Sequence, residues 1–391
     1  MTVAAQLPFD QHDPLRLAPR LRELQARGPV HRVRTALGDE AWLVTGHARV
    51  RRLLDDPRLG RSHPTPETAA RTGETLFDAV LGDFDTEAAD HARIRTLLQP
   101  HFSPRRMREL RPRVEALTAG LLDELTGHGP PADLHAGLAV PLPVLVICEL
   151  LGVPYEDRDL FRAATEAAAD TGDRARSQRG VGELFAYGRE LVARKRAQPG
   201  DDVISRLAAA EGVGDEEAAG LSMALLFAGH ETTVVHIGLG ALLLLANPEQ
   251  WRALVADPGL VPKAVEEILR ASAKGTAGGI PRYAREDLDI DGTAVRAGDL
   301  VLLGHGAANH DPAVFPDPDR LDLARPAPAH VTFGHGARYC LGAPLARIEL
   351  QAVFTQLVTR LPTLRPAVDA DGPRMRHGAL TGGLAALPVH W

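Results

Sequence analysis

One glycine-rich turn constrains the fold of this 391-residue chain more than any other segment. Residues 333–344 read Phe-Gly-His-Gly-Ala-Arg-Tyr-Cys-Leu-Gly-Ala-Pro. Glycine permits backbone angles and close approaches that a side chain would obstruct, and the turn contains three glycines, Gly334, Gly336 and Gly342. Such a turn can hold the sulfur of Cys340 against the flat face of a large cofactor.

A helix is expected directly after this turn. Pro344 suits the first turn of a helix, and apolar residues follow it at helical spacing, at Leu345, Ile348 and Val353. Unpaired amides and the positive end of the dipole stabilise an anion at a helix start, and the thiolate is the form of cysteine that binds metal. Cys340 is therefore a candidate iron ligand, and Phe333 a candidate shield of its sulfur from water. The alternative is a buried, inert structural cysteine.

The spacing Phe-x-x-Gly-x-x-x-Cys-x-Gly resembles the haem-binding loop of the cytochromes P450. The resemblance implies haem b as cofactor, Cys340 as the axial iron ligand, and Phe333, Arg338 and Gly342 as its neighbours in the cofactor site. A thiolate ligand gives the iron electron density that favours cleavage of the oxygen–oxygen bond. The implied fold is mainly α with a small β region, a triangular helical prism with haem between a long central helix and the cysteine loop.

A long, mostly buried helix is expected over residues 221–246, where Asn-Pro follows the apolar run. Its middle is polar. Gly229 lowers the helix propensity there, and Thr232 or Thr233 can compete for a backbone carbonyl and open a local kink. Taken alone, Glu231 and Thr232 are better explained as a solvated acid beside a capping or back-bonding hydroxyl.

Residues 225–233 resemble the Ala-Gly-x-Glu-Thr signature of the same family's oxygen-binding helix. The resemblance implies catalytic roles for two of them. Thr232 would help to protonate dioxygen, and Glu231 would belong to the proton relay.

Two further sets of charged residues match family positions. Glu267 and Arg270 are three residues apart and can pair on one helix face. The resemblance implies a third partner from the segment before the cysteine loop, and Arg320 is the candidate. It also implies a structural role for all three residues. The two propionates of haem require cationic or donor side chains when they are buried. The matching positions are His91, Arg95, Arg282 and Arg338.

Each of these arginines, taken singly, is also explained as a solvated surface charge. Residues 86–90 lack the prolines and the glutamate that precede the histidine in the family, which leaves the shape of this loop open.

The family's substrate-facing positions correspond to residues 61–84, 163–188, 225–229, 276–280 and 380–381. Those expected nearest the haem are Leu225, Ala228, Gly229, Ala277, Gly278, Gly279, Ile280, Leu380 and Thr381. Small and apolar residues there predict a roomy apolar cavity, or else close packing of helix and strand. The chain also looks similar to actinobacterial enzymes that oxidise macrolides or terpenoid lactones. Hydroxylation of a natural-product intermediate is favoured over epoxidation or ring coupling.

A local basic cluster stands out in an acidic chain. The cluster consists of Arg105, Arg106 and Arg108, with Arg111 and Arg113. It is either a solvated surface or, as the resemblance implies, the docking site of an acidic electron donor. That donor would be a ferredoxin or a flavodoxin-like protein, itself reduced by an NAD(P)H reductase. The formal net charge of −7 argues against a nucleic-acid surface.

The rest of the sequence predicts one soluble domain over residues 1–391. A hydrophobic fraction of 45% permits a large core, and no linker divides the chain. Helical patterns dominate between about 105 and 270, and strand-like runs occupy 30–33, 41–44 and 300–303. Two cysteines cannot form a disulfide framework, and Cys148 is expected to be a packed helix thiol. The longest apolar run, near 239–246, is shorter than the roughly 20 residues that cross a bilayer. A cytoplasmic monomer is expected.

The predicted activity is haem-thiolate monooxygenation of an apolar small molecule by O2. The alternatives are oxidative coupling, a redox-neutral rearrangement, or non-catalytic binding of haem or a gas, because a fold does not guarantee an activity.

Overall fold

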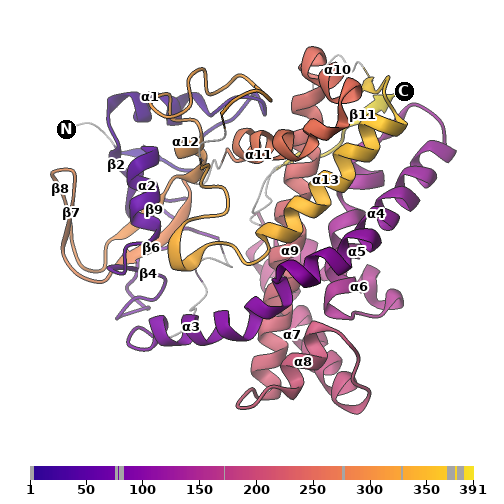
Figure 1. The fold of residues 1–391 in the computed structure, drawn as a ribbon. Helices are drawn as coiled ribbons and strands as arrows, with labels where there is room; N and C mark the ends of the chain where they lie inside the picture. The colour runs from indigo at the N-terminus through magenta and orange to yellow at the C-terminus, as the bar shows by residue number, and fades with distance from the viewer. Residues whose placement is uncertain are drawn as a thin grey trace. The chain divides into compact units, whose positions relative to one another are not determined.

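The computed structural model describes residues 4–74, 78, 83–170, 172–274, 278–326, 329–367, 375–376 and 383–391. Contacts between residues group the chain into two compact units, each made of two separate stretches of sequence (Figure 1). Unit 1 comprises Met1–Thr96 and Lys263–Leu341, and unit 2 comprises Leu97–Pro262 and Gly342–Trp391. Whether these units form the single predicted domain stays a prediction.

A six-stranded sheet forms the centre of unit 1. Its order is β1 (Ala5–Gln6), β2 (Val30–Arg34), β3 (Glu40–Val44), β9 (Leu300–Leu303), β6 (Ile280–Ala284) and β4 (Leu59–Gly60). The three strand-like runs predicted from the sequence are therefore confirmed as the neighbours β2, β3 and β9. Strands β3 and β9 are parallel, with Trp42 opposite Val301.

The sequence of β9 is apolar throughout because both of its faces are covered. Val301 and Leu303 belong to a core cluster with residues of α2 (His47–Leu54), whereas Leu300 and Leu302 belong to one with residues of α1 (Pro19–Arg27). Alternate side chains of a strand point to opposite faces, so one helix lies against each face. The remaining elements of unit 1 are the β7–β8 hairpin (Leu288–Ile290, Thr293–Val295), α12 (His305–Asn309) and η5 (Gly336–Arg338).

The chain passes between the units three times, twice within helices and once between Leu341 and Gly342, directly after the cysteine turn. The two helices that contain a crossing are α3 (Glu87–Leu98) and α11 (Val261–Ser272).

Unit 2 is a bundle of helices around α9 (Asp215–Leu245). Helices α5 (Pro141–Leu151), α7 (Arg174–Ala197) and α13 (Ala343–Arg360) pack against it (Figure 1). The others are α4 (Pro104–Gly127), α6 (Arg158–Ala168), α8 (Val203–Ala209) and α10 (Pro248–Ala256), with the short turns η1 (Gln99–Phe102), η2 (His135–Ala139), η3 (Tyr155–Asp157) and η4 (Pro258–Leu260). A small sheet has the order β10 (Arg365–Pro366), β11 (Pro388–His390), β5 (Ala132–Asp133).

The two predicted helices of unit 2 are present. Helix α9 begins six residues before the expected start, at three acidic residues, Asp215, Glu216 and Glu217, which suit the positive end of the helix dipole. Helix α13 has Pro344 in its first turn and buries Leu345, Ile348 and Val353 as predicted. The mainly helical fold with a small β region is confirmed.

Within the described part of the chain, α9 alone has the length and composition of a membrane-spanning helix. Its most apolar window has a mean hydropathy of 1.3, and 72% of that window is buried inside the protein. A core helix passes the same test, and α9 is packed as one.

Candidate active site

Cys340 ends a tight turn in unit 1. Its amide donates a hydrogen bond to the carbonyl of Phe333 at 2.8 Å and so closes the loop. Gly334 and Gly336 have φ of +76° and +68°, as a glycine turn requires. Gly342 does not share this requirement, because its φ is −77°.

The carboxylate of Asp55, the residue directly after α2, anchors the turn. Asp55 Oδ1 accepts a hydrogen bond from the amide of Ala337 at 3.0 Å. A Cβ at Gly336 would lie 1.7 Å from that oxygen, so both the backbone angle and the contact require glycine there. The sequence alone did not indicate Asp55.

The two cysteines have different surroundings. Cys148 is buried, as predicted, and burial raises the pKa of its thiol to about 12. Cys340 is exposed. Exposure argues against the alternative of a buried structural thiol and leaves Cys340 accessible to a ligand.

A cavity of about 330 Å³ lies in unit 1 beside this turn. It is lined by six of the predicted residues, His91, Ile280, Arg282, Phe333, Arg338 and Cys340. Burial and the nearby Arg338 and Arg95 lower the pKa of His91, which favours its neutral form. Arg95 lies outside this lining: its guanidinium donates to the carbonyl of Tyr339 and so holds the residue before Cys340.

Two charged residues of this region were missed by sequence reasoning. Arg61 lines the cavity beside Arg282 and Arg338, although its segment was assigned to the substrate. Glu87 is buried, and its carboxylate accepts hydrogen bonds from the amide of Arg61 and from the guanidinium of Arg338. It occurred in the sequence only within a segment that departs from the family pattern.

The positive charges at the cavity are crowded. Burial, followed by repulsion from Arg61 and Arg338, lowers the pKa of Arg282 to about 9. Burial and repulsion from Arg338 lower the pKa of Arg61 to about 10. In the part of the chain that is described, the three guanidinium groups that line the cavity outnumber the one carboxylate that contacts them, Glu87, and Arg285 also lies 3.5 Å from that carboxylate. This excess of positive charge is one that a buried anion would offset.

These residues fit a haem group. Haem carries two propionates, whose negative charges would offset this positive excess, and guanidinium groups bind carboxylates through paired hydrogen bonds. Cys340 supplies a sulfur ligand for iron, and Leu54, Ile280 and Phe333 supply apolar wall.

The predicted proton relay lies on α9, in unit 2. The hydroxyl of Thr232 is exposed and donates to the carbonyl of Ala228 at 3.1 Å, and that of Thr233 donates to Gly229 at 3.4 Å. Both hydroxyls thus bond the carbonyl four residues earlier, as expected. Helix α9 nevertheless continues through all of these residues, so the predicted kink does not interrupt the helix. Glu231 is 4% exposed, with Arg376 Nη1 3.6 Å from its Oε1.

Several small residues assigned to the substrate pocket are explained by packing. A Cβ would lie 2.9 Å from Ile147 at Gly229, 2.9 Å from Leu7 at Gly278 and 2.2 Å from the carbonyl of Leu303 at Gly279. Close packing, the alternative considered for these positions, therefore accounts for the three glycines. Leu225 is partly buried and Ala228 exposed in unit 2, whereas Ile280 lines the cavity of unit 1. Ala277, Leu380 and Thr381 lie outside the described residues.

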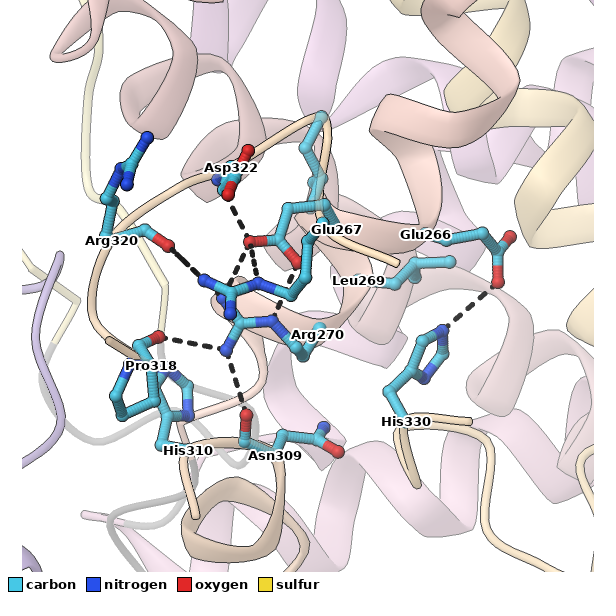
Figure 2. Close-up of polar contacts among 12 residues, drawn as sticks. Glu266, Glu267, Leu269, Arg270, Asn309, His310, Pro318, Arg320, Asp322 and His330 are labelled. Atoms are coloured by element: carbon cyan, nitrogen blue, oxygen red, sulfur yellow. Dashed lines mark hydrogen bonds and ion pairs between the residues drawn. The ribbon is translucent and has the colours of Figure 1, made fainter. Parts of the chain in front are cut away.

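The expected pair of Glu267 and Arg270 forms a buried bidentate contact, with both nitrogen–oxygen distances at 2.8 Å (Figure 2). Arg270 also donates to the carbonyls of Asn309 and Pro318, each at 2.9 Å. The network ties α11 to the segment that precedes the cysteine loop.

The third cation is Arg325, and the prediction of Arg320 was wrong. Arg325 Nε lies 3.1 Å from Glu267 Oε1, and the side chain is 8% exposed. Arg320 contributes only its carbonyl, which accepts from Arg270 and Arg325, while its own side chain points away from the network (Figure 2). The segment is irregular, so spacing in the sequence does not show which arginine points inward.

The basic cluster lies on α4 and is partly neutralised. Arg105 pairs with Glu109 at 2.9 Å, and Arg106 pairs with Asp201 at 3.2 Å. Arg108 is exposed. It is the cluster's clearest positive charge toward solvent among the three residues proposed for docking.

Comparison with known proteins covers the whole chain. Residues 191–366 match the family model described as Cytochrome P450. The chain is 45% identical to pentalenolactone synthase of Streptomyces exfoliatus, with 100% of both chains covered, and 40% identical to mycinamicin IV hydroxylase/epoxidase of Micromonospora griseorubida, with 98% of both covered. The X-ray structure of substrate-free cytochrome P450 PimD, a polyene macrolide antibiotic pimaricin epoxidase, matches with a TM-score of 0.87 at 42% identity, with 100% of both chains covered. The stretch matched by the family model contains both the turn of Cys340 and the pair Glu231–Thr232.

Proposed function

The chain belongs to the cytochrome P450 family, and from this premise we propose that it hydroxylates an apolar intermediate of a macrolide or terpenoid pathway. The family establishes that the protein is a haem monooxygenase that acts on a small molecule with O2 and electrons from redox partners. Relatives named as a hydroxylase/epoxidase and as an epoxidase of a macrolide antibiotic support the substrate class, with epoxidation as the neighbouring outcome.

The cavity beside Cys340 carries the proposal. It combines one accessible thiol, three guanidinium groups and apolar wall in a single unit. Haem b bound there supplies the oxidising chemistry, in which a C–H bond, O2, two electrons and two protons give C–OH and water.

The chain's own residues bind and orient. Cys340 ligates the iron as a thiolate, and Phe333 keeps water from the sulfur. Arg282, Arg338 and His91 hold the propionates, while Arg95 fixes the loop through the carbonyl of Tyr339.

Residues of α9 handle protons. Thr232 would supply a proton to the reaction with oxygen, and Glu231 would belong to the relay that replaces it. Arg376, 3.6 Å from Glu231, holds this carboxylate in place. Positioned proton transfer of this kind typically contributes about 10² to 10⁴ in rate.

Electrons come from an acidic ferredoxin or flavodoxin-like protein and its NAD(P)H reductase. Arg105, Arg106 and Arg108 form the docking surface on α4. Arg108 contributes most, because Arg105 and Arg106 already pair with acids of this chain.

Three measurements test this function. The carbon monoxide complex of the reduced protein is expected to show the red-shifted Soret band of a thiolate ligand, and Cys340→Ser is expected to lose it. Titration with bacterial secondary metabolites, followed by the Soret shift, identifies the substrate class. Turnover of a metabolite that binds, with a surrogate ferredoxin and reductase, is expected to give a hydroxylated product. A thiolate band that is retained in Cys340→Ser contradicts the ligand assignment. The absence of oxygenated product contradicts the proposed reaction.

A further inference from the structure

Glu87 lies among the arginines at the edge of the cavity in unit 1. We propose that Glu87 is a positioning residue that fixes Arg338 and the segment of Arg61, so that Arg61 joins Arg282 and Arg338 in binding the cofactor's carboxylates. The inference rests on the proposed function, because it takes these carboxylates to be the propionates of haem.

The contacts of Glu87 reach three separate parts of unit 1. Its Oε1 accepts from the amide of Arg61 at 2.8 Å, and its Oε2 accepts from the amide of Ser62 at 3.0 Å and from the Ser62 hydroxyl. Arg338, two residues before Cys340, donates to Oε1, and Arg285 Nη1 lies 3.5 Å from Oε2. One buried acid, 5% exposed, thus joins α3, the segment after β4 and the cysteine loop.

The backbone makes room for this acid. A Cβ at Gly60 would lie 2.7 Å from Glu87 Oε2 and 3.2 Å from Arg285 Nη1. Glycine at this position therefore allows the carboxylate to approach β4 closely.

Strand pairing brings Arg61 beside Arg282. Strands β4 and β6 are antiparallel, with Leu59 opposite Ala284 and Gly60 opposite Tyr283. Continuing this register by one residue sets Arg61 against Arg282, and both side chains line the cavity.

The charges at this edge call for an anion. The hydrogen bonds of Ser62 and Arg61 outweigh burial and lower the pKa of Glu87, so it is ionised. Glu87 favours the charged forms of both Arg61 and Arg282. Among the described residues, however, the one acceptor bonded to the guanidinium of Arg282 is the carbonyl of the adjacent Pro281, at 2.7 Å. Glu87 orders the cluster without neutralising it, which leaves Arg61 and Arg282 to bind further carboxylates.

The signs of the charges give a test that a purely structural role does not reproduce. Reduced haem carries one more negative charge than oxidised haem, so a nearby cation raises the reduction potential and a nearby anion lowers it. In the haem-loaded protein, Arg61→Gln is expected to shift the potential downward and Glu87→Gln upward. The double variant restores the original net charge and is expected to return close to the wild-type potential.

Retention of haem provides a second readout. Transfer of haem from the loaded protein to excess apomyoglobin is expected to be about tenfold faster in Arg61→Gln, since a charge-assisted hydrogen bond is lost. Arg61→Lys keeps the charge and is expected to slow the transfer again. Matched controls are the exposed Arg58→Gln and Glu286→Gln, which change the same charges away from the cavity and are expected to leave both readouts unchanged.

Distinct outcomes overturn the parts of the inference. Equal potentials and equal haem loss in wild type, Arg61→Gln and Arg61→Lys exclude Arg61 as a carboxylate ligand. If the Glu87→Gln variant folds but its reduction potential does not shift upward, Glu87 has only a structural role. The same conclusion follows if the potential of the double variant does not return close to that of the wild type. If Glu87→Gln does not fold, the comparison of Arg61→Gln with Arg61→Lys decides the proposal. Failure of the function itself is seen separately, as loss of the thiolate band in the wild type.

Discussion

At position 232, one hydroxyl is expected to decide whether electrons end in product. Thr232→Ala removes a hydroxyl that we propose as a proton donor in the reaction with oxygen, so the yield of product per NAD(P)H should fall and hydrogen peroxide should rise. The loss of productive rate should reach about 10²-fold if the hydroxyl acts in proton transfer. Peroxide and product are measured together with the native substrate.

The neighbouring threonine is the control for this experiment. Thr233 makes the same kind of bond, to the carbonyl of Gly229, but is 4% exposed. Thr233→Ala should leave the coupling near that of the wild type, whereas equal peroxide release by the two variants would exclude a special role for Thr232.

Lys274 gives a prediction about pH. Its ammonium group is buried in unit 1, with Nζ 3.1 Å from the carbonyl of Leu15 and 3.4 Å from His310 Nε2. Burial lowers the pKa of Lys274 from its ordinary 10.5 to about 7. Between these values the unfolded chain binds more protons than the folded one, so stability should rise with pH by at most about 1.4 kcal/mol per unit.

Urea denaturation of the wild type and of Lys274→Met isolates this effect. The difference in unfolding free energy between the two should shift in favour of the wild type as pH rises from about 7 toward about 10. A difference that does not vary with pH would mean that the Lys274 amine keeps its ordinary pKa.

At the scale of elements, the network around α11 gives different roles to two arginines that are close in sequence, Arg325 and Arg320. Arg325 holds Glu267 and donates to the carbonyls of Pro316 and Arg320. Arg325→Ala leaves a buried carboxylate partly unpaired and should cost about 3 to 5 kcal/mol of stability. Arg320→Ala leaves the carbonyl contact intact and should change stability by no more than about 0.5 kcal/mol.

Thermal and urea unfolding of the two variants measure this contrast. Similar destabilisation by both would assign the Arg320 side chain a part in the network that its position does not indicate.

The elements that the sequence predicted well are those with strong local patterns. The apolar run of β9 and the helical spacing of Leu345, Ile348 and Val353 in α13 are patterns of residues close together in the sequence. Both elements are present in the structure. The beginning of α9 was missed because its first turn is acidic and polar, so its start is marked by the helix dipole and not by apolar periodicity.

Residues that depend on long-range register were not predicted. Arg61 meets Arg282 through the pairing of β4 with β6, and Glu87 meets Arg338 across most of the chain. Spacing along the sequence contains no information about either contact. Motif spacing did place Cys340, His91, Arg282 and Arg338 correctly at one cavity, because these residues match a family pattern.

For the whole molecule, the net charge of −7 makes the basic cluster on α4 a local exception. Replacing Arg105, Arg106 and Arg108 by glutamate should slow reduction by an acidic ferredoxin by about tenfold or more at low salt and weaken the salt dependence. Stopped-flow reduction at several ionic strengths measures both. Arg179→Glu, an exposed change on α7, is the control; unchanged rates in the triple variant would remove the cluster from electron transfer.

The interleaving of the two units has a consequence for synthesis on the ribosome. Strand β3 pairs with β9, and Trp42 and its partner Val301 are separated by 301 minus 42, or 259, residues. The β2–β3 hairpin therefore emerges early and waits, with one edge open, while α4 to α10 are translated. An open strand edge is a template for intermolecular pairing. Nascent chains that pause before β9 is made should thus depend on chaperones more than those at any other stage. A bulky fusion at the N-terminus should lower the yield of folded protein more than one at the C-terminus.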